Sequence, residues 1–264
     1  MMSRTLRLSD GRQIRALEAG AGEPLLLIHG VGMRAEAWGP QITALSDGHR
    51  VIAVDMPGHG QSRMLPKGAC LADYVAWAAR VIEALGVGPV NLAGHSMGAL
   101  IAGGLAVDRP DLVRRVALLS GVYRRSAEAR LAVVARAEEI ARGDADVAAP
   151  LARWFGDDEG AIRDQVAAWL LEVDLEGYAA AYRAFAEGDA TYADRLGQIS
   201  CPMLVLTGEG DGNSSPAMAL AMAGAAPRGE AVVVAGHRHM VNLTAPEAVT
   251  GAMRRWLQEE ETPE

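Results

Sequence analysis

The residues best suited to chemistry in this chain surround Ser96. Ser96 lies in a Gly-x-Ser-x-Gly sequence between Gly94 and Gly98, and it separates an apolar segment, residues 90–93, from an alanine-rich one, residues 97–108. A serine at a sharp turn from a strand into a helix adopts a strained backbone, and glycines two positions away remove Cβ atoms that would collide there. Such a turn presents a hydroxyl that can attack a carbonyl group. The five residues alone fit an ordinary turn equally well, so the flanking segments carry the argument.

A serine hydroxyl is a weak nucleophile at neutral pH and needs a histidine base that is oriented by a carboxylate. Asp211 follows the apolar segment 203–206 in a glycine-rich loop, where the carboxyl end of a parallel strand would deliver it to a shared crevice. Glu209, in the same loop, is the competing acid. His237 and His239 both follow the last apolar segment, and their spacing does not decide which of them is the base.

These residues need a sheet that brings the ends of distant strands together. Residues 5–8 and 12–19 alternate in polarity around Asp10-Gly11, which predicts an antiparallel hairpin. Six further apolar segments have the composition of strands buried on both faces of a parallel sheet, and helical patterns fill most intervals between them. We therefore expect an α/β fold with a doubly wound, mostly parallel eight-stranded sheet that begins with this hairpin. The six segments are residues 25–28, 51–54, 90–93, 113–119, 203–206 and 231–235.

One long interval contains no strand candidate. Residues 126–199 consist of alanine-rich helical stretches separated by glycine-aspartate pairs, and we expect them to form an inserted helical cap. The core domain then comprises residues 1–125 and 200–264. A cap over the sheet would enclose a substrate pocket, which we expect to be shaped by aromatic side chains and by an arginine at the entrance to the cap. These residues are Trp38, Tyr123, Arg124, Trp154, Trp169 and Tyr178.

Composition limits the classes of function. The formal net charge is -8 and the basic residues are scattered, so we expect a small-molecule substrate and neither nucleic acid nor a membrane as partner. No segment reaches the roughly 18 to 20 apolar residues of a membrane span, and the first residues lack the pattern of a leader, which favours a cytoplasmic protein. Cys70 and Cys201 lack metal or redox spacing and residues 208–212 lack a phosphate-binding pattern, so we expect no metal and no cofactor. The sequence indicates no oligomeric state.

The order of these motifs resembles that of the α/β-hydrolase family over nearly the whole chain. In that family the histidine stands directly before a short apolar stretch and a Pro-Glu pair that opens the last helix, which implies His239 as the base and His237 as a neighbour. The resemblance also implies an oxyanion hole formed by the backbone amides of Val31 and Met97. Three further residues are implied to brace loops: His29, Asp55 and His59. The resemblance rests on residues 27–32, 54–62, 94–98, 208–211 and 239–247.

We therefore expect a cofactor-independent serine hydrolase that cleaves a small-molecule carboxylic ester or lactone through an acyl-enzyme, with Ser96, Asp211 and His239 as catalytic residues. Within the family the chain looks similar to small carboxylesterases and enol-lactone hydrolases. One alternative is hydrolysis of a carbon–carbon or enamine/amide bond in a catabolic intermediate whose carboxylates bind Arg124 or Arg125, although these arginines also fit a solvated start of a helix. Another alternative is a ligand receptor that has the fold but no turnover.

Overall fold

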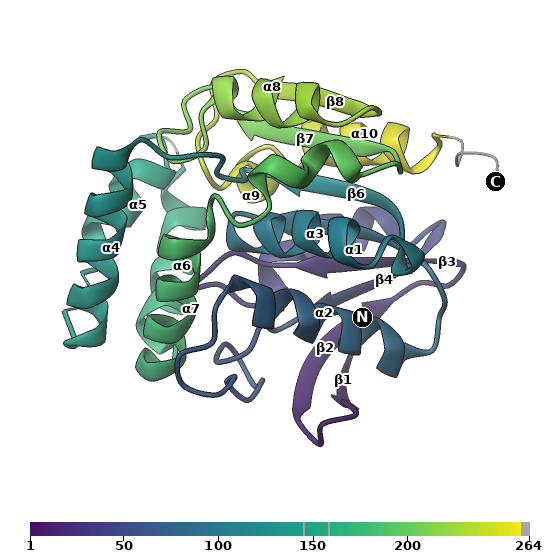
Figure 1. Cartoon of the computed structure of the whole chain (residues 1–264), viewed down its shortest axis with the longest axis horizontal. Coiled ribbons are helices and arrows are strands. Elements are labelled where there is room, and N and C mark those ends of the chain that lie inside the picture. The colour runs from purple at the N-terminus through teal and green to yellow at the C-terminus, as the bar shows by residue number, and fades with distance from the viewer. Residues whose placement is uncertain (145, 158, 260–264) are drawn as a thin grey trace.

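The computed structural model describes residues 1–144, 146–157 and 159–259. Its strands form one eight-stranded sheet in the order β1-β2-β4-β3-β5-β6-β7-β8, with helices on both faces (Figure 1). β1 and β2 form an antiparallel hairpin and β2 also runs antiparallel to β4, whereas the remaining pairs in the described sheet are parallel. The doubly wound, mostly parallel sheet that we expect from the sequence is therefore confirmed.

Short strands alternate with helices along most of the chain. The strands are β1 (Met2–Arg7), β2 (Gln13–Ala19), β3 (Glu23–Ile28), β4 (His49–Val54), β5 (Val90–His95), β6 (Val113–Leu119), β7 (Met203–Gly208) and β8 (Gly229–Val234). The helices that flank the sheet are α1 (Gly39–Leu45), α2 (Leu71–Leu85), α3 (Met97–Asp108), α8 (Pro216–Ala225), α9 (Val241–Thr244) and α10 (Pro246–Leu257). Short 3-10 turns are η1 (Ala35–Trp38), η2 (Pro110–Leu112) and η3 (Ala193–Gln198). Within the described chain we find no helix with the length and apolarity that a membrane span requires.

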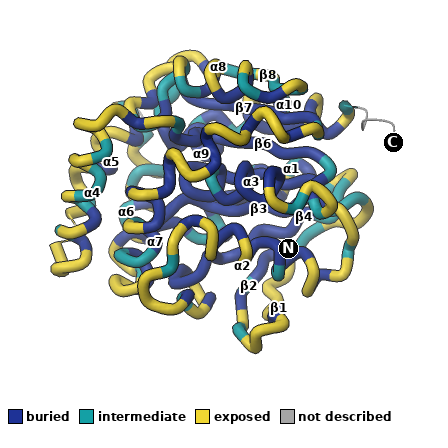
Figure 2. The backbone as a smooth tube through the Cα atoms, in the orientation of Figure 1, coloured by how far each residue is buried: buried dark blue, intermediate teal, exposed yellow. Residues whose placement is uncertain are grey.

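The central strands are buried because helices cover both faces of the sheet. In β3, Leu26 and Ile28 join one hydrophobic cluster, while Leu25 and Leu27 join a second cluster on the opposite face. This two-residue period with apolar side chains on both faces explains why the sequence shows a continuous apolar run instead of an alternation. Figure 2 shows the sheet as a buried layer, whereas much of α4 is exposed.

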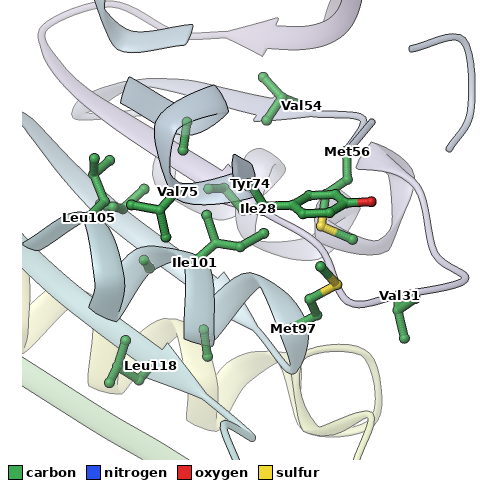
Figure 3. Packing of buried hydrophobic residues seen from close by; sticks show 14 of the residues in the cluster. Ile28, Val31, Val54, Met56, Tyr74, Val75, Met97, Ile101, Leu105 and Leu118 are labelled. Atoms are coloured by element: carbon green, nitrogen blue, oxygen red, sulfur yellow. The ribbon is translucent and has the colours of Figure 1, made fainter. Parts of the chain in front are cut away.

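The larger cluster fills the space between the sheet and helices α2 and α3. Val75 of α2 packs there with Ile101 and Leu105 of α3 (Figure 3). Val31 and Met97 belong to the same cluster, so the two positions whose amides are implied in an oxyanion hole are fixed by core packing. The smaller cluster packs α1 and α10 against the other face of the sheet.

The interval between β6 and β7 is helical. It contains α4 (Ala127–Ala141), α5 (Ala148–Trp154), α6 (Gly160–Glu172) and α7 (Leu175–Gly188), which stand at one end of the sheet (Figure 1). Side chains cap two of these helices, because Ser126 accepts a hydrogen bond from the Ala129 amide at 3.1 Å and Asp174 accepts one from the Gly177 amide at 2.7 Å. The expected absence of strands from residues 126–199 holds for the described residues of this interval.

The division into a core domain and a cap domain stays a prediction, because the structure gives the arrangement of the helices and no independent measure of a domain boundary. The core domain was expected to extend to residue 264, and residues 260–264 lie outside the described part of the chain. The name cap is used below for the four helices α4 to α7.

Cap and sheet meet at a close backbone contact between the loop after β4 and α7. A Cβ atom on Gly58 would lie 2.5 Å from the Cα atom of Gly177, and one on Gly177 would lie 2.2 Å from the carbonyl oxygen of Gly58. Gly58 also has a φ of 77°, which other residues rarely adopt. The pair of glycines therefore allows α7 to approach the loop more closely than any side chain would permit.

We predict that Gly177→Ala lowers the free energy of unfolding by about 1–3 kcal/mol, because the new methyl group must displace backbone atoms of the loop. The loss should appear although alanine favours a helix by about 1 kcal/mol over glycine. Gly224→Ala in α8 is the matched control, since the space around Gly224 is open. Urea denaturation of both variants checks the prediction, and equal stabilisation of the two would contradict the close contact.

Candidate active site

Ser96 forms the junction between β5 and α3. Its φ of 55° and ψ of −115° lie outside the regions usual for residues with a side chain, and the chain turns from strand to helix within this residue. The Ser96 amide donates to the carbonyl oxygen of Leu119 in β6 at 2.8 Å, while its carbonyl oxygen accepts from the Ala99 amide at 3.0 Å. Ser96 is only 5% exposed and borders a cavity.

The two glycines of the Gly-x-Ser-x-Gly sequence are required by close backbone approaches. A Cβ atom on Gly94 would lie 2.0 Å from the carbonyl oxygen of Gly98, and one on Gly98 would lie 2.2 Å from the carbonyl oxygen of Ile28. Strand β5, helix α3 and the end of β3 therefore cross at a distance that only glycine tolerates. The glycine pattern thus belongs to a sharp strand-to-helix junction with the geometry of a nucleophile elbow and not to an ordinary turn, while the role of Ser96 as nucleophile stays a prediction.

Asp211 and His239 form a hydrogen-bonded pair, with 2.8 Å between the Asp211 carboxylate and Nδ1 of His239. The other carboxylate oxygen of Asp211 accepts from the amides of Asn213 at 2.8 Å and Ser214 at 3.0 Å. Burial would raise the pKa of Asp211, but its electrostatic interaction and hydrogen bond with His239, together with these two amides, lower it below its usual value. With Nδ1 directed to a carboxylate, Nε2 of His239 is the nitrogen that can take a proton.

The competing acid and the competing histidine have other contacts. Glu209 accepts from the Gly236 amide at 3.0 Å and so holds the loop after β8. His237 directs Nδ1 toward the hydroxyl of Thr244 at 3.0 Å and toward Glu159 at 3.4 Å. The structure thus brings Asp211 to His239, whereas the sequence alone left the choice of acid and base open.

His95 and Ser120 hold the loop between β8 and α9, residues 235–240, which carries His239 and is called the histidine loop below. The sequence did not reveal this role. Nε2 of His95 lies 2.9 Å from the carbonyl oxygen of His239, and the Ser120 hydroxyl donates to the same oxygen at 3.1 Å. Burial, and then the nearby His239, lower the pKa of His95 to about 3, so its neutral ring donates to the carbonyl group. A hint was present in the sequence, because both residues directly follow buried strand positions.

The loop after β3 lies against Ser96. A Cβ atom on Gly30 would be 3.0 Å from the Cβ atom of Ser96, and Val31 borders the same cavity as Ser96. The Met97 amide is the first of α3, and the first amides of a helix lack intrahelical acceptors and carry a partial positive charge. The amides of Val31 and Met97 are therefore the candidate donors to an oxyanion on a carbon attached to Ser96, which stays a prediction.

Neutral histidines and a carboxylate brace the loops around this point. Nε2 of His59 accepts from the amide of Gly32 at 2.9 Å, and Nε2 of His29 accepts from the amide of Met56 at the same distance. Burial lowers the pKa of His29 to about 4 and that of His59 to about 3, so both rings stay neutral acceptors. Asp55, which is fully buried, accepts from the Ala35 amide at 2.8 Å.

A cavity of about 540 Å³ lies between the end of the sheet and the cap, and Ser96 and His239 border it. The ring of Trp154, from α5, lies 5.7 Å from the ring of His239. Among the described residues, no cluster of histidine, cysteine or carboxylate side chains is suited to hold a metal ion. The lining residues are Val31, Ser96, Val122, Arg125, Ala129, Ala132, Val133, Arg136, Glu139, Asp146, Ala149, Arg153, Trp154, Tyr182, Phe185, Gly212, Asn213, Met218 and His239.

Comparison with known proteins decides the family. The model of a family described as alpha/beta hydrolase fold matches residues 23–246. The chain belongs to the α/β-hydrolase fold family. This membership confirms the resemblance seen in the sequence motifs, and it agrees with the strained strand-to-helix junction at Ser96, the Asp211–His239 pair and the sheet order described above.

Individual α/β-hydrolases extend the comparison. The (E)-2-((N-methylformamido)methylene)succinate hydrolase of Acinetobacter baylyi is 54% identical over 260 residues, which cover 98% of this chain and 99% of that protein. The structure of a malate-bound thermophilic esterase from Thermogutta terrifontis has a TM-score of 0.88 at 29% identity, covering 99% of this chain and 100% of that one. The structure of an E-2-(acetamidomethylene)succinate hydrolase has a TM-score of 0.80 at 26% identity, covering 98% and 99%.

Of the six pocket residues expected from this α/β-hydrolase sequence, Trp154 borders the cavity. The others do not appear in its described lining, which corrects the expectation. Trp38 is fully buried in the cluster on the opposite face of the sheet, and Trp169 packs in the larger core cluster. Tyr178 lies beside Gly32, and the hydroxyl of Tyr123 is 3.4 Å from a backbone carbonyl oxygen of η3. Composition had identified large apolar side chains without indicating the surface that each one covers.

The expected arginine at the cavity, Arg124, is wrong by one position, because its neighbour Arg125 lines the cavity. Arg124 has a φ of 47°, is 53% exposed at its side chain and pairs with Asp194, whereas Arg125 borders the cavity. The Arg125 side chain is only 4% exposed, lies 3.5 Å from Asp189 and stacks on Phe185 with 4.3 Å between guanidinium carbon and ring. Burial lowers the pKa of Arg125, and its Nη2 atom has no hydrogen-bond partner among the described residues.

Two further arginines of the cap border the cavity, and sequence reasoning missed both. Arg136 of α4 lies 3.1 Å from Glu139 and also donates to backbone carbonyl groups of the segment before α5. Arg153 of α5 is exposed and, within the described chain, has no ion-pair partner. The signal present in the sequence was Arg153-Trp154, in which a cation stands next to an aromatic residue of the cap.

The neutral histidines of this α/β-hydrolase predict a pH dependence of stability. His29, His59 and His95 have folded-state pKa values of about 4, 3 and 3, below the 6.5 of an exposed histidine. The unfolded chain therefore binds more protons between pH 6.5 and about 4, and the free energy of unfolding falls as the pH is lowered through that window. Each histidine contributes up to about 1.4 kcal/mol per pH unit.

Urea denaturation at pH 7.5, 6 and 5 measures this slope. In the His95→Asn variant the slope of the free energy of unfolding against pH should decrease by the contribution of one histidine, because the asparagine amide still donates but does not titrate. A free energy of unfolding that stays flat between pH 7 and 5 would contradict the neutral state of the three rings.

Proposed function

We propose that this chain is a serine hydrolase that cleaves the amide bond of an N-acylated enamine bearing carboxylates, a compound of the N-acylaminomethylene-succinate class. The observation that carries the proposal is the cavity in which Ser96 and His239 meet the cationic side chains of Arg125 and Arg153. The 54% identical relative is described as acting on (E)-2-((N-methylformamido)methylene)succinate, which belongs to this class and has two carboxylates. These findings support the amide alternative better than the ester or lactone that we expected first.

In the first step the Ser96 hydroxyl attacks the formyl or acyl carbon. His239 takes the hydroxyl proton at Nε2, while Asp211 stabilises the resulting imidazolium through Nδ1 at 2.8 Å. The carbonyl oxygen becomes an oxyanion, which the amides of Val31 and Met97 would bind. Loss of one such donor typically costs about 3 kcal/mol of transition-state stabilisation.

In the second step the carbon–nitrogen bond breaks. His239 returns its proton to the departing nitrogen, and the enamine leaves while the acyl group stays on Ser96 as an ester. The enamine is a better leaving group than a simple amine, because the carbon–carbon double bond and its carboxylate delocalise the electron pair. Water then attacks the ester and gives a proton to Nε2 of His239. The carbon–oxygen bond to Ser96 breaks, His239 passes that proton to the Ser96 oxygen, and the carboxylic acid leaves.

The arginines of the lining suit a substrate with two carboxylates, because the acidic lining residues already have partners: Glu139 pairs with Arg136, and Asp146 accepts from the amides of Ala148 and Ala149. Arg136 is already engaged by Glu139 and by backbone carbonyl groups, so among the described lining residues Arg125 and Arg153 are the cations whose guanidinium groups have unused hydrogen-bond donors. A guanidinium binds a carboxylate through two parallel hydrogen bonds. Such contacts select a charged substrate over a neutral one of equal shape.

Esters remain useful probes, because attack on an ester uses the same Ser96, His239 and oxyanion amides as attack on an amide. The esterase from Thermogutta terrifontis, 29% identical in sequence, is described as malate bound, so a dicarboxylate also binds that relative of the fold. A receptor without turnover would contain the fold yet leave Ser96 unreactive. Reaction of Ser96 therefore separates the enzyme from the receptor.

We predict that Ser96→Ala abolishes hydrolysis of (E)-2-((N-methylformamido)methylene)succinate and labelling by a fluorophosphonate. His239→Gln should lower kcat by at least about 10³-fold, because the base is lost, whereas His237→Gln should change it less than about tenfold. Loss of the substrate's ultraviolet absorbance measures the rate, and circular dichroism shows whether each variant is folded. Full activity of folded Ser96→Ala would refute the serine mechanism.

We predict that Arg153→Met raises KM at least about tenfold for monomethyl succinate and less than about twofold for methyl butanoate. The two esters have similar shapes, but only the first ends in a carboxylate, so the difference isolates the contact with charge. Arg124→Met is the matched control, since Arg124 is exposed and pairs with Asp194 away from the cavity. An equal change in KM for both esters would exclude a carboxylate at Arg153.

A further inference from the structure

Arg238 connects the histidine loop to the cap. It stands between His237 and His239, and its Nη1 atom donates to the carbonyl oxygen of Ala152 at 2.9 Å and to that of Phe155 at 2.7 Å. These two carbonyl groups belong to the C-terminal end of α5, where carbonyl groups lack intrahelical donors and the helix carries a partial negative charge. A cation is the favoured partner at such a position.

His237 makes a second contact between the histidine loop and the chain that follows α5. His237 lies 3.4 Å from Glu159, whose carboxylate accepts from the Gly156 amide at 2.6 Å. Two consecutive residues of the histidine loop therefore contact this region: Arg238 binds the end of α5, and His237 contacts Glu159 in the segment that follows it. The side chain that makes the shorter contacts is Arg238.

The loop from which Arg238 extends is firmly held by the sheet domain. The Gly210 amide donates to the carbonyl oxygen of His237 at 2.9 Å, and His95 and Ser120 bind the carbonyl oxygen of His239. A Cβ atom on Gly208 would lie 2.4 Å from the carbonyl oxygen of Arg238, so β7 packs directly against this loop. Arg238 thus transmits the position of a rigid loop to α5.

Helix α5 carries two side chains that face the substrate cavity. Arg153 and Trp154 both border it, and the Trp154 ring lies 5.7 Å from that of His239. α5 has only seven residues, too short to be stable by itself, so its place depends on tertiary contacts. Release of its C-terminal end would move Arg153 and Trp154 relative to His239.

We propose that Arg238 is a positioning residue for substrate selection: it fixes the end of α5 so that Arg153 and Trp154 face the substrate beside His239. Arg238 acts through α5 and does not touch the substrate. The inference rests on the proposed function where it concerns carboxylate selection, but its structural part, the fixing of α5, stands on the hydrogen bonds alone.

The test compares full-length wild type with Arg238→Met, Arg238→Lys, Arg153→Met and the double variant Arg153→Met/Arg238→Met. Selectivity is the ratio of kcat/KM for monomethyl succinate to that for methyl butanoate. Arg238→Met should lower this ratio at least about fivefold, mainly through KM for the succinate, and Arg238→Lys should lower it less because an ammonium still donates to the carbonyl groups. The double variant should lose no more selectivity than Arg153→Met, since both changes act on one contact.

Hydrogen exchange of the α5 amides provides a readout that does not depend on the substrate. These amides should exchange at least about tenfold faster in Arg238→Met than in wild type, while those of α10 stay unchanged. Arg254→Met is the matched control, because Arg254 donates to the carbonyl oxygen of Ala44 near the end of α1, away from the cavity. It should alter neither the selectivity nor the exchange of α5.

The outcomes separate the two proposals. Wild-type exchange of α5 in Arg238→Met, unchanged selectivity in that variant, or additive losses in the double variant would each overturn the positioning role of Arg238. A folded Ser96→Ala variant that keeps its activity would overturn the proposed function, as would a wild type without preference for the succinate ester. In both of those cases the hydrogen exchange of α5 still decides whether Arg238 fixes the helix.

Discussion

The strained backbone of Ser96 is the constraint on which the rest of the site depends. A φ of 55° at a residue with a side chain costs roughly 1–3 kcal/mol, and it persists because β5 is buried along its whole length and α3 packs directly behind it. The close approach at Gly94 and Gly98 then leaves one conformation for the turn. Because the turn is fixed, the serine hydroxyl and the first amide of α3 are presented to the same side of the sheet.

The remaining groups reach that point from neighbouring strands. Asp211 follows β7, His239 follows β8, and their contact is secured by His95 at the end of β5 and Ser120 at the end of β6. Four consecutive strands of the sheet order thus contribute to the placement of one imidazole ring. The groups that hold the ring, Asp211, His95 and Ser120, are all buried, so a misplaced ring would leave buried donors and acceptors unpaired.

The sequence predicted those features that depend on periodicity and on close backbone contacts. Apolar runs located the strands, and the glycines around Ser96 located the elbow. Features that depend on the direction of a side chain were beyond it: Trp38 covers the opposite face of the sheet, and the arginine at the cavity is Arg125 and not Arg124. Arg124 and Arg125 have the same side chain, and the direction in which each points depends on backbone angles such as the positive φ of Arg124. A sequence pattern does not encode these angles.

The strands on either side of the cap, β6 and β7, are direct neighbours in the sheet. The chain therefore leaves the sheet after β6, forms the four cap helices and returns as the neighbouring strand β7. The length of this inserted segment does not affect how the two strands pair. A longer or shorter segment between β6 and β7 would therefore leave the pairing of these strands, and the site at their ends, unchanged. Gly58 limits this freedom, because any replacement that keeps a helix at that spot must meet the loop with a residue as small as Gly177.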